Sequence, residues 1–244
     1  MKIAILAAGY GTRLYPITQN IAKPLIPINN KPMMNYLMDK IDLLRDKFCV
    51  KEVNIVTNNK FYTSFLDWKK KYKINAEILN DGSNSQDDML GAIGDMKFAI
   101  NSNNSDWLVL GGDNLFEDDL LGFIDFSLRN RPYSSVGLYD VKTKKEASRF
   151  GIVIVNNRKR IVEFYEKPMI PLSTLAASCV YFFSKQSLNL LDEFISQKAK
   201  IDASGKFIAW LVDNSKVFGY TLKGKWIDIG HFDSLKLAEK EFKS

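Results

Sequence analysis

Apolar and polar residues follow two different patterns along the first half of the chain. Nearly continuous apolar runs, typical of strands buried on both faces, lie at 2–7, 52–57, 76–80 and 107–111. Segments between them repeat their apolar residues with a helical period, which predicts helices at 32–48, 61–72 and 89–100. This alternation predicts an α/β fold with a mostly parallel sheet that is covered by helices on both faces.

The second half follows a looser pattern. Short apolar runs, bounded by turn residues, predict strands at 135–139, 151–155, 161–165 and 177–183. The polar residues 156–159 suit a hairpin connection between two of these strands. Helical spacing predicts helices at 185–197, 206–213 and 232–242. Because some of the strands are joined by turns, we expect a mixed sheet in this half.

Length and composition indicate one soluble α/β domain. The chain has 244 residues, of which 46% are hydrophobic, and no linker or repeat divides it. We therefore predict a single domain over 1–244, with a first half at 1–115 and a second half at 116–244. No apolar run approaches the roughly 18 residues that span a bilayer, and no signal sequence opens the chain. A cytoplasmic protein with no membrane partner is expected.

The cysteines and the net charge exclude some functional classes. Cys49 and Cys179 are too few to form a disulfide framework, and no spacing suits a zinc site. The formal charge of +6 is spread along the chain, and its densest run, Lys69–Lys71, lies in a predicted surface helix. We therefore predict no nucleic-acid partner. A modest positive charge does suit substrates that carry phosphates.

The loop that follows the first predicted strand has the features of an anion site. Gly9 and Gly11 allow a tight bend in which backbone N–H groups can approach phosphate oxygens, and Arg13 and Lys23 add positive charge. The loop is not a Walker loop, because Thr12 follows Gly11 in place of Lys. Nor is it a dinucleotide fingerprint, since a third glycine is missing. Glycines alone would equally suit a simple turn, but Arg13 and Lys23 favour phosphate binding.

Two further strands are predicted to end in carboxylates. Asp113 follows the apolar run 107–110 and two glycines, and Asp228 lies in the similar stretch 226–230. Each Asp by itself is more often a turn residue. Together with the glycine loop, the pair predicts an Mg²⁺ site shared with triphosphate oxygens, because Mg²⁺ normally takes one or two protein carboxylates.

A third polar group lies in the second half. Gly151, Glu166 and Lys167 each lie at a predicted strand edge, and Pro168 follows them. Lys167 could hold the phosphate of an acceptor, and Glu166 could accept hydrogen bonds from sugar hydroxyls. An exposed strand end that is stopped by a proline is an equally good interpretation of these residues.

These stretches, in this order, resemble the sugar-phosphate nucleotidyltransferases, especially glucose-1-phosphate thymidylyltransferases and uridylyltransferases. The resemblance rests on 6–18 with Lys23-Pro24, 111–114, 166–168 and 226–230. It implies a three-layer, Rossmann-like fold whose central sheet is mixed and mostly parallel. It also implies an enzyme that needs Mg²⁺ and binds a nucleoside triphosphate and a sugar 1-phosphate; the oligomeric state stays open, a homo-oligomer included.

The resemblance also implies roles for individual residues. The catalytic residues would be Arg13, Lys23, Asp113 and Lys167. The nucleotide would be bound by Leu6, Ala8, Gly9, Gly11, Thr12, Arg13, Asn80, Gly91 and Asp113. The sugar phosphate would be bound by Asn114, Gly151, Glu166 and Lys167, and the metal by Asp113 and Asp228.

Departures from the family pattern leave the substrates open. Asn80 stands where many thymidylyltransferases have a base-reading Gln, and 173–174 and 178–179 differ from the usual residues near the sugar. dTTP or UTP and glucose 1-phosphate are favoured. The chain ends at Ser244 without hexapeptide repeats, so a bifunctional acetyltransferase form is not expected.

The expected reaction is an in-line attack of the sugar phosphate on the α-phosphorus, and it requires no general base because the nucleophile is already anionic. We therefore interpret His231 as a structural residue.

The alternatives are a cytidylyltransferase acting on phosphocholine and a catalytically silent nucleotide-sensing subunit. The first would need an aromatic cage, for which Tyr139, Phe150, Tyr165, Tyr181 and Trp226 are candidates. A glycosyltransferase is disfavoured because its metal motif does not accompany such a loop.

Overall fold

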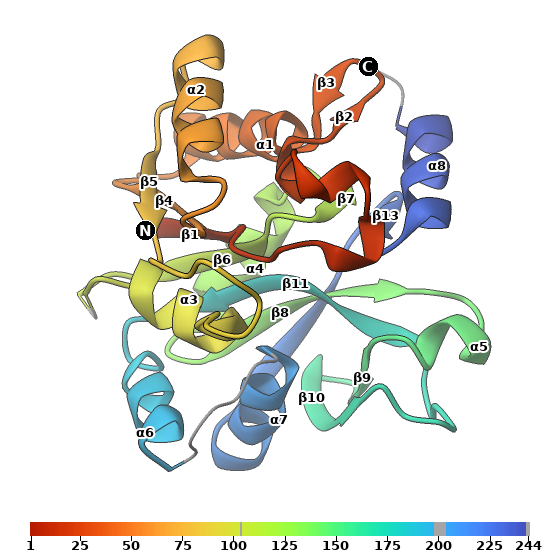
Figure 1. Ribbon diagram of the computed structural model, residues 1–244. Helices are drawn as coiled ribbons and strands as arrows, with labels where there is room; N and C mark the ends of the chain where they lie inside the picture. The colour runs from red at the N-terminus through yellow and green to blue at the C-terminus, as the bar shows by residue number, and fades with distance from the viewer. Residues whose placement is uncertain (103, 198–203, 243–244) are drawn as a thin grey trace.

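The computed structural model describes residues 1–102, 104–197 and 204–242. A nine-stranded sheet runs through the molecule and takes strands from both halves of the chain (Figure 1). Its first four strands are β1 (Lys2–Leu6), β4 (Val53–Thr57), β5 (Glu77–Asn80) and β6 (Trp107–Gly111). They are mutually parallel, in the order β5-β4-β1-β6, and confirm the four strands expected in the first half.

The second half extends this sheet. Its strands are β8 (Ser134–Asp140), β9 (Gly151–Val155), β10 (Arg160–Glu166), β11 (Leu175–Phe183) and β12 (Val217–Thr221). They continue from β6 in the order β11-β8-β12-β10-β9. β10 and β11 run against the other strands, so the sheet is mixed and mostly parallel as predicted. The hairpin between β9 and β10 is also confirmed, and Asn156 Oδ1 accepts hydrogen bonds from the N–H groups of Arg158 and Arg160 there.

Helices cover both faces of the sheet and make three layers (Figure 1). One face is covered by α1 (Met33–Lys47), α2 (Tyr62–Tyr72) and α4 (Leu121–Arg129). The other face is covered by α3 (Gly91–Ala99), α6 (Asn189–Gln197) and α7 (Ser204–Asn214). Fully buried Phe65 and Phe123 lie on the first face, and Phe194 and Phe207 on the second. Each such side chain contributes about 1.5–3 kcal/mol of burial free energy, which is why the two faces close over the sheet.

Smaller elements lie at one end of the sheet. They are the pair β2 (Pro27–Ile28) and β3 (Lys31–Pro32), the pair β7 (Asn114–Phe116) and β13 (Trp226–Asp228), and the helices α5 (Lys144–Ala147) and α8 (Phe232–Glu241). A separate apolar cluster, which includes Leu14, Leu115 and Ile229, joins the first loop to these elements. This cluster holds segments from both ends of the sequence against the same edge of the sheet.

Some elements differ from the sequence-based expectations. α4 and β12 were not predicted, and β13 lies in a stretch that had been considered only for its carboxylate. α6 begins at Asn189 and not at residue 185, because Ser184 and Ser187 hydrogen-bond to each other in a preceding turn. Gly219 interrupts the apolar pattern of β12, which is stabilised by its parallel pairing with β8. In the parts of the chain that the structure describes, no helix combines the length and the apolar composition needed to cross a bilayer.

Candidate active site

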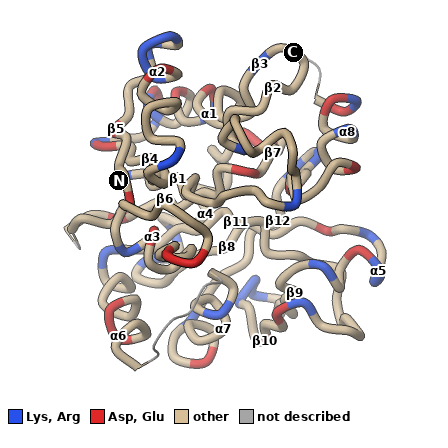
Figure 2. The backbone as a smooth tube through the Cα atoms, in the orientation of Figure 1, with Lys and Arg blue, Asp and Glu red and all other residues tan. Residues whose placement is uncertain are grey.

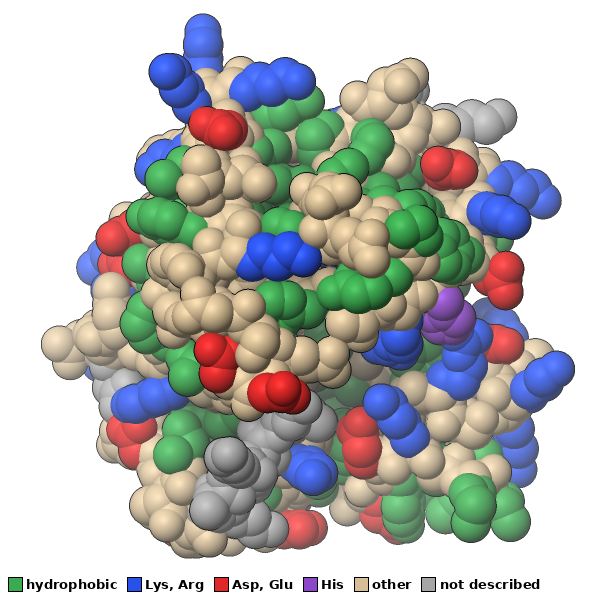
Figure 3. Space-filling view, viewed as in Figure 1, with side chains coloured by type: hydrophobic (Ala, Val, Ile, Leu, Met, Phe, Trp, Pro, Cys, Tyr) green, Lys and Arg blue, Asp and Glu red, His purple; other side chains and the backbone are tan. Residues whose placement is uncertain are grey.

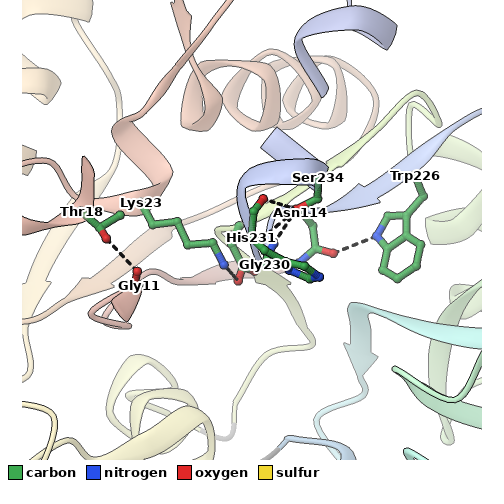
Figure 4. A network of polar contacts seen from close by, with 9 residues as sticks. Gly11, Thr18, Lys23, Asn114, Trp226, Gly230, His231 and Ser234 are labelled. Carbon is green, nitrogen blue, oxygen red and sulfur yellow. Dashed lines mark hydrogen bonds and ion pairs between the residues drawn. The ribbon is translucent and has the colours of Figure 1, made fainter. Parts of the chain in front are cut away.

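The first loop makes a tight bend directly after β1. Gly11 has φ 62°, a left-handed conformation that glycine adopts without steric cost. Thr18 Oγ1 donates a hydrogen bond of 2.7 Å to the Gly11 carbonyl and ties the bend to the chain that follows (Figure 4). A short 3₁₀ turn then spans Thr12–Leu14, with Leu14 buried beneath it. As a result, Arg13 is carried on an anchored turn with its side chain exposed.

Lys23 links this loop to the end of β6. It is only 9% exposed, and its Nζ lies 2.6 Å from Asp113 Oδ2 (Figure 4). The close approach depends on the glycines before Asp113. Gly112 N donates to the Leu6 carbonyl at 2.9 Å, and a Cβ at Gly112 would lie only 2.9 Å from that same oxygen. Glycine at this position therefore allows the ends of β1 and β6 to meet, as the sequence pattern indicated.

A chain of hydrogen bonds orients Asp113. Asn114 Nδ2 donates to Asp113 Oδ1 at 2.8 Å, and Trp226 Nε1 donates to Asn114 Oδ1 at 2.8 Å (Figure 4). Asn114 and Trp226 are both buried, so each polar group needs the partner that it has. The pairing of β7 with β13 also sets Asn114 opposite Asp228. Asp113 and Asp228 are 115 positions apart in the sequence, and this pairing brings them near each other.

The pKa shifts of Asp113 and Asp228 show that the charge of Lys23 acts on both carboxylates. Burial and, after it, the charge of Asp113 raise the pKa of Asp228 to about 6, against the opposing effects of Lys23, Arg13 and His231. Burial also acts to raise the pKa of Asp113, but the charge and hydrogen bond of Lys23 hold that pKa below its usual value. Two carboxylates that lie this close are difficult to ionise together without a cation.

These residues fit a divalent metal ion. Mg²⁺ prefers oxygen ligands and usually takes only one or two protein carboxylates, and the remaining ligands come from water and phosphate oxygens. Burial and the neighbouring charge of Asp113 raise the pKa of Asp228, so a bound cation would stabilise its ionised form. Within the described residues, no group of three or more His, Cys, Asp or Glu side chains forms a complete metal cage. An ion held by Asp113 and Asp228 would therefore depend on further ligands from a substrate.

Two adjoining cavities open around Lys23 and Asp113. The first, of about 280 Å³, is lined by Leu6, Ala7, Ala8, Gly9, Lys23, Pro24, Met89, Gly91, Ala92, Asp95, Val109, Gly111, Asp113, Cys179, Tyr181 and Ser204. The second, of about 240 Å³, is lined by Gly9, Tyr10, Gly11, Thr12, Arg13, Leu14, Lys23, Gln86, Met89, Asp113 and Gly230. Gly9, Lys23, Met89 and Asp113 belong to both linings. The ion pair of Lys23 and Asp113 thus stands where the two cavities meet.

The residues suggested for nucleotide binding divide between these cavities. Leu6, Ala8 and Gly91 line the first, whereas Gly11, Thr12 and Arg13 line the second. Asn80 lines neither cavity. Its side chain donates to Asn59 Oδ1 at 2.8 Å and accepts from Gly82 N at 2.9 Å, so it stabilises the loop that follows β5. Asn114, suggested for the sugar phosphate, is likewise engaged by Asp113 and Trp226.

The antiparallel hairpin of β9 and β10 carries the other residues suggested for the sugar phosphate. Gly151 pairs with Glu166 across this hairpin, and the Lys167 N–H donates to the Phe150 carbonyl at 3.1 Å. Glu166 and Lys167 are exposed, and neither lines the two cavities. The charge of Glu166 nevertheless contributes to the raised pKa of Tyr181, whose main cause is burial. Glu166 therefore lies close to the wall of the first cavity. We call Gly151–Lys167 the sugar arm.

Several residues of the cavity walls had no distinguishing sequence signal. Cys179, Tyr181 and Ser204 line the first cavity from β11 and the start of α7. Burial and, after it, the charges of Asp113 and Asp228 raise the pKa of the Cys179 thiol to about 12. Such a thiol stays protonated and is unsuited to nucleophilic attack. The position of β11 beside β6 brings Cys179 and Tyr181 to the site.

The suggested aromatic cage is not assembled as an open binding site. Phe150 and Tyr139 pack against Trp226, with ring centroids 5.0 Å and 5.5 Å from its own. Trp226 is 8% exposed and donates its N–H to Asn114. Tyr165 is exposed and hydrogen-bonds Glu163. Three of the five aromatics therefore pack on one another, which does not favour recognition of a quaternary ammonium.

His231 begins α8 and is held by local contacts. Ser234 Oγ accepts hydrogen bonds from Gly230 N at 3.0 Å and His231 N at 3.1 Å, and it donates to the His231 carbonyl at 2.8 Å (Figure 4). The imidazole Nε2 contacts Arg149 Nη2. His231 thus has a structural place at the helix start, and its contact with Arg149 was not anticipated from the sequence.

Comparison with known proteins places this site in a family. The profile of the family described as "Nucleotidyl transferase" matches residues 2–244. The chain belongs to this nucleotidyltransferase family. The resemblance stated from the sequence motifs is therefore confirmed, and so is the assignment of the chain as an enzyme of this class.

Relatives and solved structures agree with the family. Proteins named "Bifunctional protein GlmU" from Methanococcus aeolicus and Methanocaldococcus jannaschii are 29% identical over 233 residues and 32% identical over 235 residues. Each comparison covers 94% of this chain and 51% of the relative, so the chain spans about half the length of these proteins. A Bacillus anthracis crystal structure, assigned as a glucose-1-phosphate thymidylyltransferase, is 23% identical with a TM-score of 0.81, covering 98% of this chain and 94% of that chain. The last comparison confirms the three-layer nucleotidyltransferase fold.

Proposed function

We propose that this chain transfers a nucleoside monophosphate from a nucleoside triphosphate to a sugar 1-phosphate, with Mg²⁺, and releases pyrophosphate. The observation that carries this proposal is the convergence of the Gly11–Arg13 bend, Lys23 and Asp113 around two adjoining cavities, with Asp228 in electrostatic contact with Asp113 and Lys23. dTTP or UTP and glucose 1-phosphate are the favoured substrates. Residues 1–115 would serve the nucleotide, and residues 116–244 would contribute the sugar arm and the second carboxylate.

In this reaction, a phosphate oxygen of the sugar 1-phosphate forms a bond to the α-phosphorus of the triphosphate. The bond between the α-phosphorus and the α,β-bridging oxygen breaks, and pyrophosphate leaves with the electron pair. No proton has to be removed from the nucleophile. The protein must therefore align the two substrates and balance the negative charge that gathers in the transition state.

The site residues suit these two tasks. Arg13 lines the second cavity with the N–H groups of the glycine bend, and its planar guanidinium can bind two phosphate oxygens at once. Lys23 stands between the cavities, where it can contact the α-phosphate. Asp113 and Asp228 would hold Mg²⁺, which supplies charge neutralisation and fixes the phosphate geometry when bound. Lys167 on the sugar arm would bind the phosphate of the sugar.

A substrate matrix tests the proposal. Purified protein is incubated with Mg²⁺ and each pairing of dTTP, UTP, CTP, ATP or GTP with several sugar 1-phosphates and phosphocholine, and pyrophosphate release is measured. We expect release with at least one sugar 1-phosphate and with dTTP or UTP as the best nucleotide. Release with phosphocholine alone would identify the cytidylyltransferase alternative. Nucleotide binding without release from any pairing would identify a silent nucleotide-sensing subunit.

A further inference from the structure

Two consecutive residues connect the sugar arm to the segment that carries Asp228. Phe150 packs on Trp226, with ring centroids 5.0 Å apart, and Trp226 lies two residues before Asp228. Arg149 contacts His231, which lies three residues after Asp228. Arg149 and Phe150 therefore contact residues that lie on both sides of Asp228 in the sequence. Figure 3 shows the single His of the sequence at the surface, bordered by Lys or Arg side chains.

His231 is the fixed partner in this contact. Its backbone makes two hydrogen bonds with Ser234 Oγ at the start of α8, and the neighbouring Gly230 N donates a third to the same oxygen. A guanidinium can only donate hydrogen bonds, so Nε2 of His231 must accept from Arg149. Nδ1 is buried and has no hydrogen-bond partner among the described residues, so the contact with Arg149 is the polar interaction that orients the ring.

The other side of the Arg149 guanidinium is held by Glu146, a residue of the same segment. Arg149 Nη1 lies 3.0 Å from Glu146 Oε2, which aligns the guanidinium between α5 and α8. The next residue, Phe150, accepts the backbone hydrogen bond from Lys167, and Gly151 then begins β9. A shift at Arg149 would therefore move Gly151 and Lys167 directly. Figure 2 shows α5 at the margin of the molecule, whereas β10 of the sugar arm lies beside α7, against which it packs.

We propose that Arg149, through His231, is a positioning residue for the sugar 1-phosphate. The contact closes the sugar arm onto the segment that carries Asp228, so that the sugar phosphate on the arm and the triphosphate at Asp113 and Asp228 meet in line. This inference rests on the proposed function. It assigns a role to two residues outside both cavity linings. It also predicts an effect that is confined to one of the two substrates.

Steady-state kinetics of matched variants test this role. We expect Arg149→Ala to raise the KM for the sugar 1-phosphate about tenfold at saturating nucleotide, and to leave the KM for the nucleotide within about twofold. Arg149→Lys keeps the charge but not the planar fork, and it should have an intermediate effect. The control is Lys145→Ala, which removes one positive charge from the exposed surface of α5 and should change neither KM.

A double-mutant cycle and hydrogen exchange separate positioning from a general loss of structure. His231→Leu should reproduce the effect of Arg149→Ala, and the double variant should be no worse than either single variant. Amide exchange of residues 143–151 should become faster in Arg149→Ala, and α1 and β1 should stay unchanged. Equal rises of both KM values, additive effects in the double variant, or unchanged exchange at 143–151 would each overturn the proposal.

The exchange measurement keeps this inference distinct from the proposed function. If the wild-type protein released no pyrophosphate from any pairing, the proposed function would fail, and the exchange result would still decide whether Arg149 restrains the sugar arm. If the wild type were active and Arg149→Ala behaved like Lys145→Ala, only the present inference would fail.

Discussion

The nucleotide side and the sugar arm of this protein are built differently. On the nucleotide side, Lys23 and Asn114 are 9% and 3% exposed, and the Asp113 carboxylate is held by both of them. On the sugar arm, Glu166 and Lys167 are exposed, and the arm is an antiparallel hairpin attached near the end of the sheet. Parallel strands β1 and β6 support the first region, whereas the second is supported by antiparallel pairing with β11 and β12, by packing against α7 and by the contact of Phe150 with Trp226.

This difference separates two tasks of the enzyme. Charge balance at the α-phosphate requires groups that are already oriented before the substrate arrives, because reorganising them during the reaction would raise the barrier. Sugar recognition requires hydrogen bonds from residues that can adjust, and an exposed hairpin allows this. Substitutions on the nucleotide side should therefore reduce kcat strongly, and substitutions on the sugar arm should mainly raise one KM.

The largest effect is expected at Asp113. Asp113→Asn removes the proposed metal ligand and the ion-pair partner of Lys23 but keeps the shape of the side chain. We expect kcat to fall by about 10³-fold, because both charge contacts act on the reacting phosphate. Pyrophosphate release measures the activity, and circular dichroism checks the fold. A folded Asp113→Asn variant with near-normal kcat would contradict the assignment of the nucleotide side.

Arg13 should give the next largest effect. Arg13→Ala is expected to lower kcat by about 10²-fold, since one preorganised charge contact is lost from the second cavity. The side chain is exposed, so the free energy of unfolding should hardly change. Arg158→Ala, on the exposed turn of the β9–β10 hairpin, removes the same charge far from the cavities and serves as the control. Equal losses in the two variants would indicate a general charge effect.

Asp228 links stability to pH in the metal-free protein. Its pKa is raised to about 6 in the folded state from an ordinary value of 3.8, so folding disfavours its charged form. Stability should therefore fall as the pH rises from about 4 to about 6 and stay low above that range. Asp228→Asn removes this penalty and should raise the free energy of unfolding at pH 7.5 by about 2 kcal/mol.

Urea unfolding without metal measures this change, with Asp213→Asn as an exposed control. The same Asp228→Asn variant should lose activity, because it also loses a metal ligand. Mg²⁺ should stabilise the wild type above pH 6 more than it stabilises the variant. A variant that is less stable than the wild type at neutral pH would show that the two carboxylates do not repel each other in the folded protein.

The smallest effect is expected on the sugar arm. Glu166→Gln keeps the size of the side chain but replaces a charged acceptor for sugar hydroxyls, so the KM for the sugar 1-phosphate should rise about fivefold with little change in kcat. Glu163→Gln, on the same strand β10, is the matched control and should leave both KM values unchanged. A large fall in kcat for Glu166→Gln would remove the contrast between the two regions.

The fold was predictable where each element carries its own pattern. β1 and β6 are apolar runs that lead into glycines, and α1 buries Met34, Leu37, Met38, Ile41 and Leu44 at helical spacing. By contrast, β12 has five residues with a glycine at its centre, and its stability comes from pairing with β8. Such an element has too little local signal to be distinguished from a loop.

The residues that carry the chemistry of the site could be predicted from the sequence, whereas several residues that line its cavities could not. Gly11, Arg13, Lys23 and Asp113 could be selected because residue type and position after a strand both indicate phosphate chemistry. Cys179, Tyr181 and Ser204 could not, since their types are common in any core and their place depends on the neighbour of β11. The contact of Arg149 with His231 joins residues 82 positions apart, and neither lies in a pattern that indicates a pair.

By itself, the amino-acid sequence determined which strands end in glycine and carboxylate, and hence the kind of chemistry that the edge of the sheet can support. The tertiary structure alone decided that Asp113 and Asp228 share one electrostatic environment, because the β7–β13 pairing brings together two strands that are distant in the chain. It also decided that Asn114 donates a hydrogen bond to Asp113 and that Arg149 contacts His231. Pairing between distant segments depends on the whole packed core, and a local pattern of residues does not encode it.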